Sequence, residues 1–287
     1  MQTIKNPAMP SSPKKTSKPL ASRIFDGENM RSVQLGRILL TLFFIGTWQL
    51  GAGRIFETFY FSKPSAIIAH LWKELFDTGF YYDLWITSVE MFLGYAFGAI
   101  AGIVLGVALS RWEYVSRVVD PFLLALNSIP RIAVAPLLIV WFGIDMSSKV
   151  FLAATLVFFI MFFNTLSGVR SVNRAYCDIA RIQGASERQI FTKVMLPSAS
   201  SWIITGLKMS LPFALVGVII GEFMVSSHGL GYRLNYYSTS YNTTGALAII
   251  IFMMILMMAL TTVVDKIEAR LLRWRPSHLN AAENFKV

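Results

Sequence analysis

The chain has 287 residues, of which 55% are hydrophobic and only 15% are charged, and its mean hydropathy is +0.56. A soluble domain carries about 25% charged residues, so the composition excludes an ordinary soluble protein and indicates a membrane protein. The single cysteine, Cys177, excludes an internal disulfide. The net charge of +10 does not require nucleic acid as a partner, because the placement of the basic residues explains it, as shown below.

Residues 1–35 are rich in Ser, Pro and Lys and contain no apolar run. A secretory signal peptide needs an apolar region of about 7–15 residues, so this segment is predicted to be a disordered basic tail. Two roles stay open for it, namely orienting the first span and binding lipid. We expect residues 36–275 to form the transmembrane domain, with a core of about 80–265, and residues 276–287 to form a second tail.

Six stretches are long and apolar enough, or nearly so, to cross about 30 Å of hydrocarbon. They are Ile38–Gly53, Leu84–Ser110, Pro121–Ile144, Val150–Val169, Trp202–Val225 and Ala246–Val264. Lipid offers the backbone no hydrogen-bond partners, so each stretch is expected to be a helix. The predicted fold class is an all-α membrane protein with six transmembrane helices.

The distribution of Lys and Arg predicts the orientation of these spans. With the N-terminus inside, 20 of the 26 basic residues fall on the cytoplasmic side, and the outer segments hold five bases and five acids. Both termini and the loop from Arg170 to Ser201 are therefore expected to be cytoplasmic. The expected location is the inner membrane, with the lipid bilayer around the spans.

Four glycines, Gly94, Gly98, Gly102 and Gly106, recur at intervals of four in the second span, so they share one face of the helix. Small residues at this spacing let two helix backbones approach closely in a membrane. Two interpretations stay open, packing within one subunit and dimerisation of two copies along the stripe.

The third span is expected to break at Asn127-Ser128-Ile129-Pro130, because Pro130 removes a backbone donor and Arg131 follows it. A charge at mid-depth costs at least about 2.5–3.5 kcal/mol, so Arg131 should face water or the protein interior. One hypothesis places Asn127, Ser128, Pro130, Arg131 and Glu222 on a path or gate for an anion. The alternatives are an ion pair between Arg131 and Glu222, and an arginine that extends to the cytoplasmic surface.

A polar stretch, Asp178–Pro197, lies between two apolar runs. Gly184 can adopt the left-handed conformation that ends a helix, and Ser186 with Gln189 forms a capping box that starts the next one. Leu196-Pro197 is expected to end that second helix. The stretch therefore predicts two short helices joined by a tight elbow, a shape that suits insertion into a cleft on a soluble partner.

The same stretch resembles a known motif. Asp178-Ile179-Ala180, Gly184 and Val194-Met195-Leu196-Pro197 match the spacing of the EAA motif of ABC importer permeases, with Asp, Ile and Val replacing the family's Glu, Ala and Ile. Further stretches are similar to the nitrate, sulfonate, taurine and bicarbonate branch of that family: Pro136-Leu137, Trp141-Phe142-Gly143, Gly206-Leu207-Lys208, Gly229-Leu230-Gly231 and Arg273-Trp274.

The resemblance implies a type I ABC importer permease fold, a second permease copy, two cytoplasmic ATPase subunits and an extracytoplasmic solute-binding protein. It implies a small anion or organic acid as the substrate. It also favours contact between the binding protein and the segment Ser226–Gly245, which alone could equally be an ordered plug. The residues expected to couple the permease to the ATPase are Asp178, Ala180, Gly184, Ala185, Ser186, Arg188, Gln189, Leu196 and Pro197.

The sequence contains no P-loop, no Cys/His cluster with zinc spacing and no nucleophile elbow. We therefore expect no catalytic residues, no metal and no cofactor in this chain, with ATP and Mg²⁺ bound by the partner ATPase. Two rival functions are a stand-alone secondary transporter or channel and a membrane enzyme. An associated ATPase would distinguish an ABC permease from both.

Overall fold

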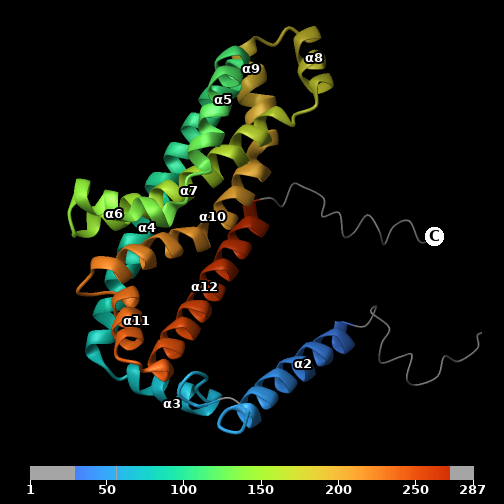
Figure 1. Ribbon diagram of the computed structural model, residues 1–287. Coiled ribbons are helices and arrows are strands. Elements are labelled where there is room, and N and C mark those ends of the chain that lie inside the picture. Colours follow the sequence, from blue (N-terminus) through green and yellow to red (C-terminus); the bar gives the residue numbers. More distant parts are fainter. Residues whose placement is uncertain (1–29, 56, 272–287) are drawn as a thin grey trace, which may run out of the picture. The chain divides into compact units, whose positions relative to one another are not determined.

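The computed structural model describes residues 30–55 and 57–271, and most of these residues are helical (Figure 1). Among them, five helices are long and apolar enough to cross a membrane, and a bent pair of helices can supply a sixth span. The predicted all-α class is thus confirmed. Most of the expected N-terminal tail, the whole segment 276–287 and the Arg273-Trp274 pair lie outside the described residues.

The first described helix, α2 (Met30–Gly51), belongs to a separate compact unit that ends at Glu57. It begins eight residues before the expected span and includes residues 30–35, which the sequence assigned to a disordered tail. That boundary is corrected here, because extending an existing helix by a residue is far easier than starting one. Its large apolar side chains from Leu35 onward are mostly exposed, as suits a helix in lipid.

Three long helices form the centre of the second unit: α4 (Thr78–Arg111), α7 (Met146–Arg170) and α10 (Leu196–Val225). The helix α7 packs along both α4 and α10. Their shared core consists of small and flexible apolar side chains, which are Met91, Ala99, Ala153, Val157, Met161, Ala214, Leu215 and Val218. This core joins the three long helices of the unit.

The glycine stripe of α4 lies against α7. A methyl group at Gly94 would lie 2.6 Å from the Ala153 side chain, and one at Gly102 would lie 2.6 Å from Met161. Gly98 and Gly106 face the same helix. Of the two interpretations, packing within one subunit is therefore the one that this structure shows, and the stripe is not free to pair with a second copy.

The third predicted span consists of α5 (Glu113–Asn127) and α6 (Arg131–Phe142), which meet at 90°. The helix α6 packs on α7 through Ala135, Leu138 and Leu152. The predicted break at residues 127–130 is confirmed, and it turns the chain sideways rather than merely kinking one helix.

At one end of the long helices lie α3 (Pro64–Glu74), α11 (Leu230–Thr239) and the start of α12 (Thr243–Leu271) (Figure 1). Phe80, Leu230 and Ile249 form a buried cluster that joins α4, α11 and α12. The segment Ser226–Gly245, expected to be a loop, therefore contains an ordered helix with a buried N-terminus.

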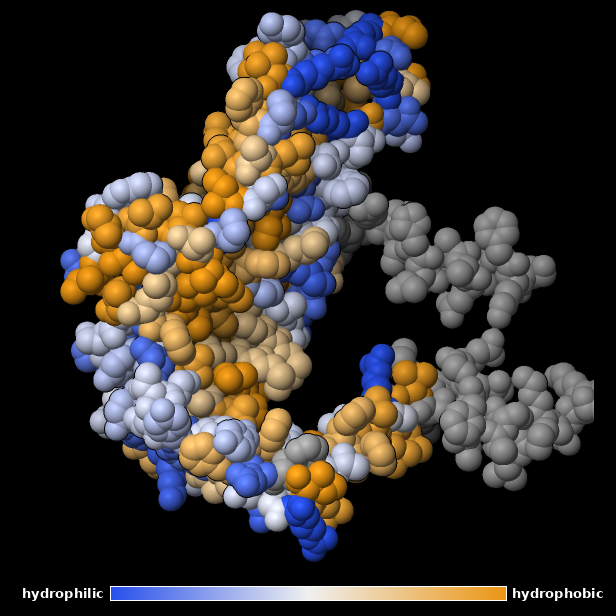
Figure 2. Space-filling view, in the orientation of Figure 1, coloured by the Kyte–Doolittle hydropathy of each residue, from blue (hydrophilic) through white to orange (hydrophobic). Residues whose placement is uncertain are grey.

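At the opposite end lie α8 (Arg174–Ile182) and α9 (Glu187–Ile190), followed by a π-helical turn, η1 (Phe191–Met195) (Figure 1). Hydrophilic side chains gather around this end, whereas apolar surface covers the helices beyond it (Figure 2). The chain therefore presents a polar end region next to an apolar band, the pattern expected where a span leaves the membrane.

Candidate functional site

The elbow between α8 and α9 is built from two local hydrogen-bonding motifs. Gly184 has φ +84°, and its amide donates to the carbonyl of Arg181 at 2.9 Å. The next amide, of Ala185, donates to the carbonyl of Ala180 at 2.9 Å. This pair of bonds is the Schellman motif, which ends a helix with a left-handed residue, so the predicted role of Gly184 in the elbow's geometry is confirmed.

The second motif starts α9 only two residues later. The backbone amide of Ser186 donates to Oε1 of Gln189 at 2.9 Å, and the amide of Gln189 donates to the Ser186 hydroxyl at 3.4 Å. The predicted capping box is therefore present. Local hydrogen bonds therefore satisfy the backbone at both helix ends and stabilise the shape of the elbow.

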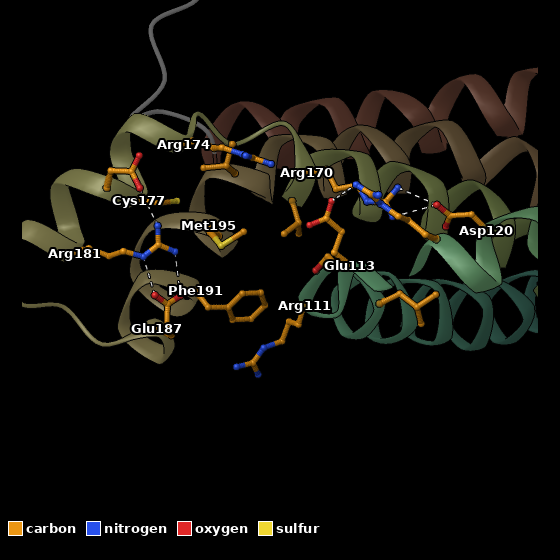
Figure 3. A pocket seen from close by; sticks show the side chains of 16 residues that line it. Arg111, Glu113, Asp120, Arg170, Arg174, Cys177, Arg181, Glu187, Phe191 and Met195 are labelled. Atoms are coloured by element: carbon orange, nitrogen blue, oxygen red, sulfur yellow. Dashed lines mark hydrogen bonds and ion pairs between the residues drawn. The ribbon is translucent and has the colours of Figure 1, made fainter. Parts of the chain in front are cut away.

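Arg181 joins the two short helices across the elbow. Its Nε and Nη2 atoms donate to the two carboxylate oxygens of Glu187 at 2.8 and 3.3 Å, and its Nη1 donates to Asp178 at 2.9 Å. Glu187, with a smaller contribution from Asp178, raises the pKa of Arg181 above its ordinary value. The guanidinium therefore links α8 to α9 through a solvent-exposed ion pair (Figure 3).

The helix α8 exposes apolar side chains that the rest of the chain does not cover. Tyr176, Ile179 and Ile182 are 60%, 53% and 86% exposed, whereas Cys177 is buried. Of the predicted coupling residues, Asp178, Gly184, Ser186, Arg188, Gln189 and Pro197 are exposed, and Ala180, Ala185 and Leu196 are partly exposed. The structure thus places seven of these nine residues on one accessible elbow, whereas Leu196 and Pro197 begin α10. The exposed apolar face of α8 was not predicted from the sequence.

The prediction that Leu196-Pro197 ends the second short helix is wrong. The helix α9 continues through η1 into α10, so residues 187–225 form one apolar span. In η1 the amide of Leu196 donates to the carbonyl of Phe191, five residues earlier. This wider turn accommodates the ring of Pro197, which would clash with the carbonyl four residues earlier in a regular α-helix.

A cleft of about 970 Å³ separates the elbow from the ends of the long helices (Figure 3). Arg111, the last residue of α4, places its guanidinium 4.7 Å from the centre of the Phe191 ring. Arg170, the last residue of α7, donates to Asp120 of α5 at 3.2 Å. The ends of α4 and α7, the helix α5 and the elbow therefore meet around one cavity.

The break between α5 and α6 holds the other predicted site residues. Asn127, Ser128 and Pro130 are exposed in this chain, and Pro130 is the N-cap residue of α6. The Nη2 atom of Arg131 donates to the backbone and side-chain oxygens of Asn127 at 3.4 and 3.3 Å, and the guanidinium lies 4.3 Å from the Phe159 ring centre. These four residues therefore lie together at one exposed corner.

Glu222 lies elsewhere, so the predicted grouping with Arg131 is wrong, as is the alternative ion pair. The Glu222 side chain is fully buried. One carboxylate oxygen accepts from the Thr87 hydroxyl and the other from the Gly231 amide, both at 2.7 Å. The reason is that the chain after α10 folds back over Glu222 and covers it. With no accessible surface, Glu222 does not line a path in this structure.

Glu222 belongs to a set of polar residues that we call the α11 cluster: Glu74, Asp77, Asp83, Thr87, Glu90, Lys149, Glu222, Ser226 and Arg233. The amides of Gly229, Leu230 and Gly231 donate in turn to Asp83, Thr87 and Glu222 at 2.8, 2.8 and 2.7 Å. These side chains satisfy the free N–H groups at the start of α11. They explain how this end of α11 can be buried.

Both basic members of the α11 cluster, Lys149 and Arg233, form largely buried ion pairs with carboxylates. Arg233 donates to Glu74 at 2.6 Å, to Asp77 at 2.8 Å and also to Asp83. Lys149 donates to Glu90 at 2.9 Å and to Ser226 at 3.0 Å. Lys149 and Arg233 are two of the five bases that the sequence analysis counted in the outer segments, and these pairs were not predicted. The equal number of acids and bases in the outer segments was the one feature of the sequence that could have indicated ion pairs there.

Comparison with known proteins identifies the family. The model of the binding-protein-dependent transport system inner membrane component matches residues 94–273, more than half of the chain. The formylaminopyrimidine transport permease protein ThiX of Halalkalibacterium halodurans is 32% identical over 238 residues, which are 82% of this chain and 95% of ThiX. SsuC of Bacillus subtilis, named for aliphatic sulfonate transport, is 32% identical over 244 residues, 84% of this chain and 88% of SsuC.

A solved structure shows the same fold at a greater distance. The inward-facing MetNI methionine ABC transporter matches 72% of this chain and 96% of its own chain, with a TM-score of 0.53 and 20% identity. The two sequence relatives are transport permeases rather than enzymes. This chain is therefore a multi-pass inner-membrane protein and belongs to the family of inner-membrane components of binding-protein-dependent transport systems.

Proposed function

We propose that this chain is the permease subunit of an ABC importer and that a cytoplasmic ATPase docks on the elbow. The observation that supports this most strongly is the exposed apolar face of α8, formed by Tyr176, Ile179 and Ile182. Amphipathic helices commonly bind partners by placing such a face in a groove. The two capped helices and the Arg181 bridge let the elbow transmit a push as one body.

The orientation follows from the basic residues. The elbow end, including Arg111, Arg170, Arg174 and Arg188, is cytoplasmic, and both termini lie on that side. ATP and Mg²⁺ bind to the ATPase, so this chain needs no cofactor of its own. The α11 end faces outward, where the ordered helix α11 offers a contact surface to the solute-binding protein.

The translocation path forms between this chain and a second copy of it. Asn127, Ser128, Pro130 and Arg131 line the path or its gate, because the break exposes them on one corner of the single chain. Irregular backbone at membrane depth is tolerated where it lines a cavity. The bilayer covers the remaining apolar surface.

The substrate is a small anion or organic acid, such as nitrate, bicarbonate, taurine or another sulfonate. The relatives alone do not identify it, since ThiX is named for a formylaminopyrimidine and SsuC for aliphatic sulfonates. Arg131 supports the anion, because its guanidinium makes no ion pair with a carboxylate among the described residues. It donates hydrogen bonds to Asn127 and lies over the Phe159 ring.

Docking is tested by replacing Ile179 and Ile182 with serine and measuring how much ATPase co-purifies. Fully burying one isoleucine contributes about 1.5–3 kcal/mol, so each substitution should weaken association by about tenfold or more. The matched control is Ile267→Ser, which changes an isoleucine that is 49% exposed on α12. Undiminished co-purification of the double variant would rule out the elbow as the docking site.

The anion path is tested by comparing Arg131→Gln with Arg131→Lys in uptake of a labelled alkanesulfonate. Losing a charge-assisted hydrogen bond costs about 1.5–3 kcal/mol, so the Gln variant should transport about tenfold less or worse, while Lys retains most activity. Basal ATPase activity and assembly should stay unchanged in both. Failure of the Gln variant to assemble would instead show that Arg131 stabilises the structure.

A further inference from the structure

The cleft behind the elbow has an excess of positive charge. Its lining includes the arginines Arg111, Arg117, Arg170, Arg174 and Arg181 and the acids Glu113, Asp120, Asp178 and Glu187. Every one of these acids already has an arginine partner: Arg117 pairs with Glu113, Arg170 with Asp120, and Arg181 with the other two. Arg111 and Arg174 make no ion pair with any carboxylate in the described ranges, so two guanidiniums remain available.

The cleft also has an apolar part. Leu109, Val169, Val172, Phe191 and Met195 contribute to its lining. Arg111 and Arg170 are the final residues of the apolar helices α4 and α7, so the cleft begins where these spans end. A ligand there meets both apolar side chains and guanidiniums, and Figure 3 shows Arg174 and Arg111 on different sides of the opening.

We propose that this cleft binds the phosphate group of an anionic phospholipid from the cytoplasmic leaflet. Basic pockets between transmembrane helices on the cytoplasmic side bind lipid head groups in this way. Arginine suits the role, because its planar fork donates two hydrogen bonds to phosphate oxygens. The location depends on the orientation given under the proposed function.

A free phosphate compound offers the same charged group, but two features favour a lipid. The cleft lies at the membrane boundary, and its apolar residues can contact the glycerol and the first methylenes of acyl chains, which a nucleotide or inorganic phosphate lacks. A bound lipid would touch Phe191 and Arg181 of the elbow and also Arg111 of α4. It would thereby fill the space between the elbow and the spans that must move with it.

The test uses the complete ATPase–permease complex in nanodiscs of phosphatidylethanolamine with and without phosphatidylglycerol. Native mass spectrometry measures how much phosphatidylglycerol each permease retains after mild delipidation. The variant is Arg111→Gln with Arg174→Gln, and the control is Lys266→Gln with Arg270→Gln, which removes two exposed charges from α12. Each basic residue near the surface changes lipid affinity by about fivefold, so the cleft variant should lose retention while the control resembles the wild type.

Three results would overturn the proposal. The first is equal retention by the cleft variant and the wild type, and the second is no preference for phosphatidylglycerol over phosphatidylethanolamine. The third is displacement by millimolar inorganic phosphate or ATP, which would identify a soluble ligand instead. The ATPase that co-purifies is quantified in the same samples, so a failure of the docking proposal is recognised separately from a failure of the lipid proposal.

Discussion

The two ends of the central helices both use arginine or lysine with carboxylates, but in opposite surroundings. In the α11 cluster, the side chains of Lys149 and Glu90 are 7% and 1% exposed, and that of Arg233 is 13% exposed. At the elbow, the side chains of Arg181 and Glu187 are 50% and 74% exposed. One set of charges is part of the protein core, and the other stands in solvent.

This difference indicates which end is rigid. A buried ion pair ties its helices together because separating the charges leaves one of them uncompensated. An exposed pair contributes little, so the elbow relies mainly on its Schellman motif and capping box for its shape. The ends of α4, α7 and α10 near α11 should therefore move as one body. At the elbow, α9 is continuous with α10, so only α8 can change its position relative to the spans.

The largest effect is expected from Lys149→Met. Glu90 would remain buried without its partner, and breaking a buried pair in this way costs about 3–5 kcal/mol. Thermal unfolding of the solubilised protein should show a large fall in midpoint, and Glu90→Gln added to the variant should recover much of it. Arg117→Met, which removes an exposed pair with Glu113, serves as the control and should change stability by about 1 kcal/mol or less.

If Lys149→Met unfolds no more readily than Arg117→Met, the distinction between the two ends fails. The rescue by Glu90→Gln is equally informative. A fall in midpoint that persists in the double variant would mean that the lysine stem, rather than its charge, supports the packing.

Glycine substitutions compare the two ends by the space that surrounds the backbone. A methyl group at Gly231 would lie 2.7 Å from Cβ of Glu222 and 2.8 Å from the carbonyl oxygen of Ile219, whereas one at Gly184 would meet no atom within 4 Å. Gly231→Ala should cost about 1–3 kcal/mol through overpacking. Gly184→Ala should cost only the left-handed backbone strain of about 1–2 kcal/mol, with its main effect on ATPase coupling.

Unfolding midpoints and transport rates of the two variants separate these effects. We expect Gly231→Ala to lower stability first and transport only as a consequence. Gly184→Ala should lower transport by more than its stability loss of about 1–2 kcal/mol explains. The reverse pattern would contradict the assignment of the rigid end.

The features that could be predicted from the sequence are those that depend on neighbouring residues. The elbow, its capping box and the break at Pro130 follow from turn and cap chemistry within a few positions. The spans follow from apolar composition. The failed prediction at Pro197 also concerns neighbouring residues. The π-helical turn before Pro197 removes the clash between its ring and the preceding turn, and no simple sequence pattern distinguishes such a turn from the end of a helix.

The α11 cluster could not be predicted in the same way, because its partners lie far apart in the chain. Lys149 and Glu90 are separated by 59 positions, and Arg233 and Glu74 by 159. Charged residues near the ends of spans are ordinarily solvated, so loop composition assigned Lys149 and Arg233 to the surface. The packing of α7 on α4 brings Lys149 to Glu90, and the fold-back of α11 brings Arg233 to Glu74 and covers Glu222.

At the elbow, Arg181→Gln should change coupling more than stability. The caps keep α8 and α9 helical, but the angle between them loses its bridge to Glu187. We expect substrate-stimulated ATPase activity and uptake to fall severalfold at unchanged thermal midpoint. Glu187→Gln should have a smaller effect, because Arg181 keeps its contact with Asp178. The double variant should be no worse than Arg181→Gln alone, because that change already removes the bond to Glu187. Additive losses would show that the two residues act separately.

The smallest effect is expected within the α11 cluster itself, at Asp77. Arg233 binds Asp77 as well as Glu74, but the Asp77 side chain is 49% exposed while that of Glu74 is 7% exposed. Solvent screens the ion pair between Arg233 and the exposed Asp77, so Asp77→Asn should cost about 1 kcal/mol or less at neutral pH.

The pH dependence of this small effect identifies its cause. The hydrogen bond from Arg233, followed by that from the Gly79 amide, lowers the pKa of Asp77 below its ordinary value. A carboxyl group with a lowered folded-state pKa contributes its stability above the unfolded pKa, near 3.9, and loses it as the pH falls through the folded value. The difference in unfolding midpoint between Asp77→Asn and the wild type should therefore be constant from about pH 5 to 8 and shrink below about pH 4. A difference that persists at acidic pH would instead assign the effect of Asp77 to its neutral contacts at the start of α4, and the exposed branch of Arg233 would then contribute nothing.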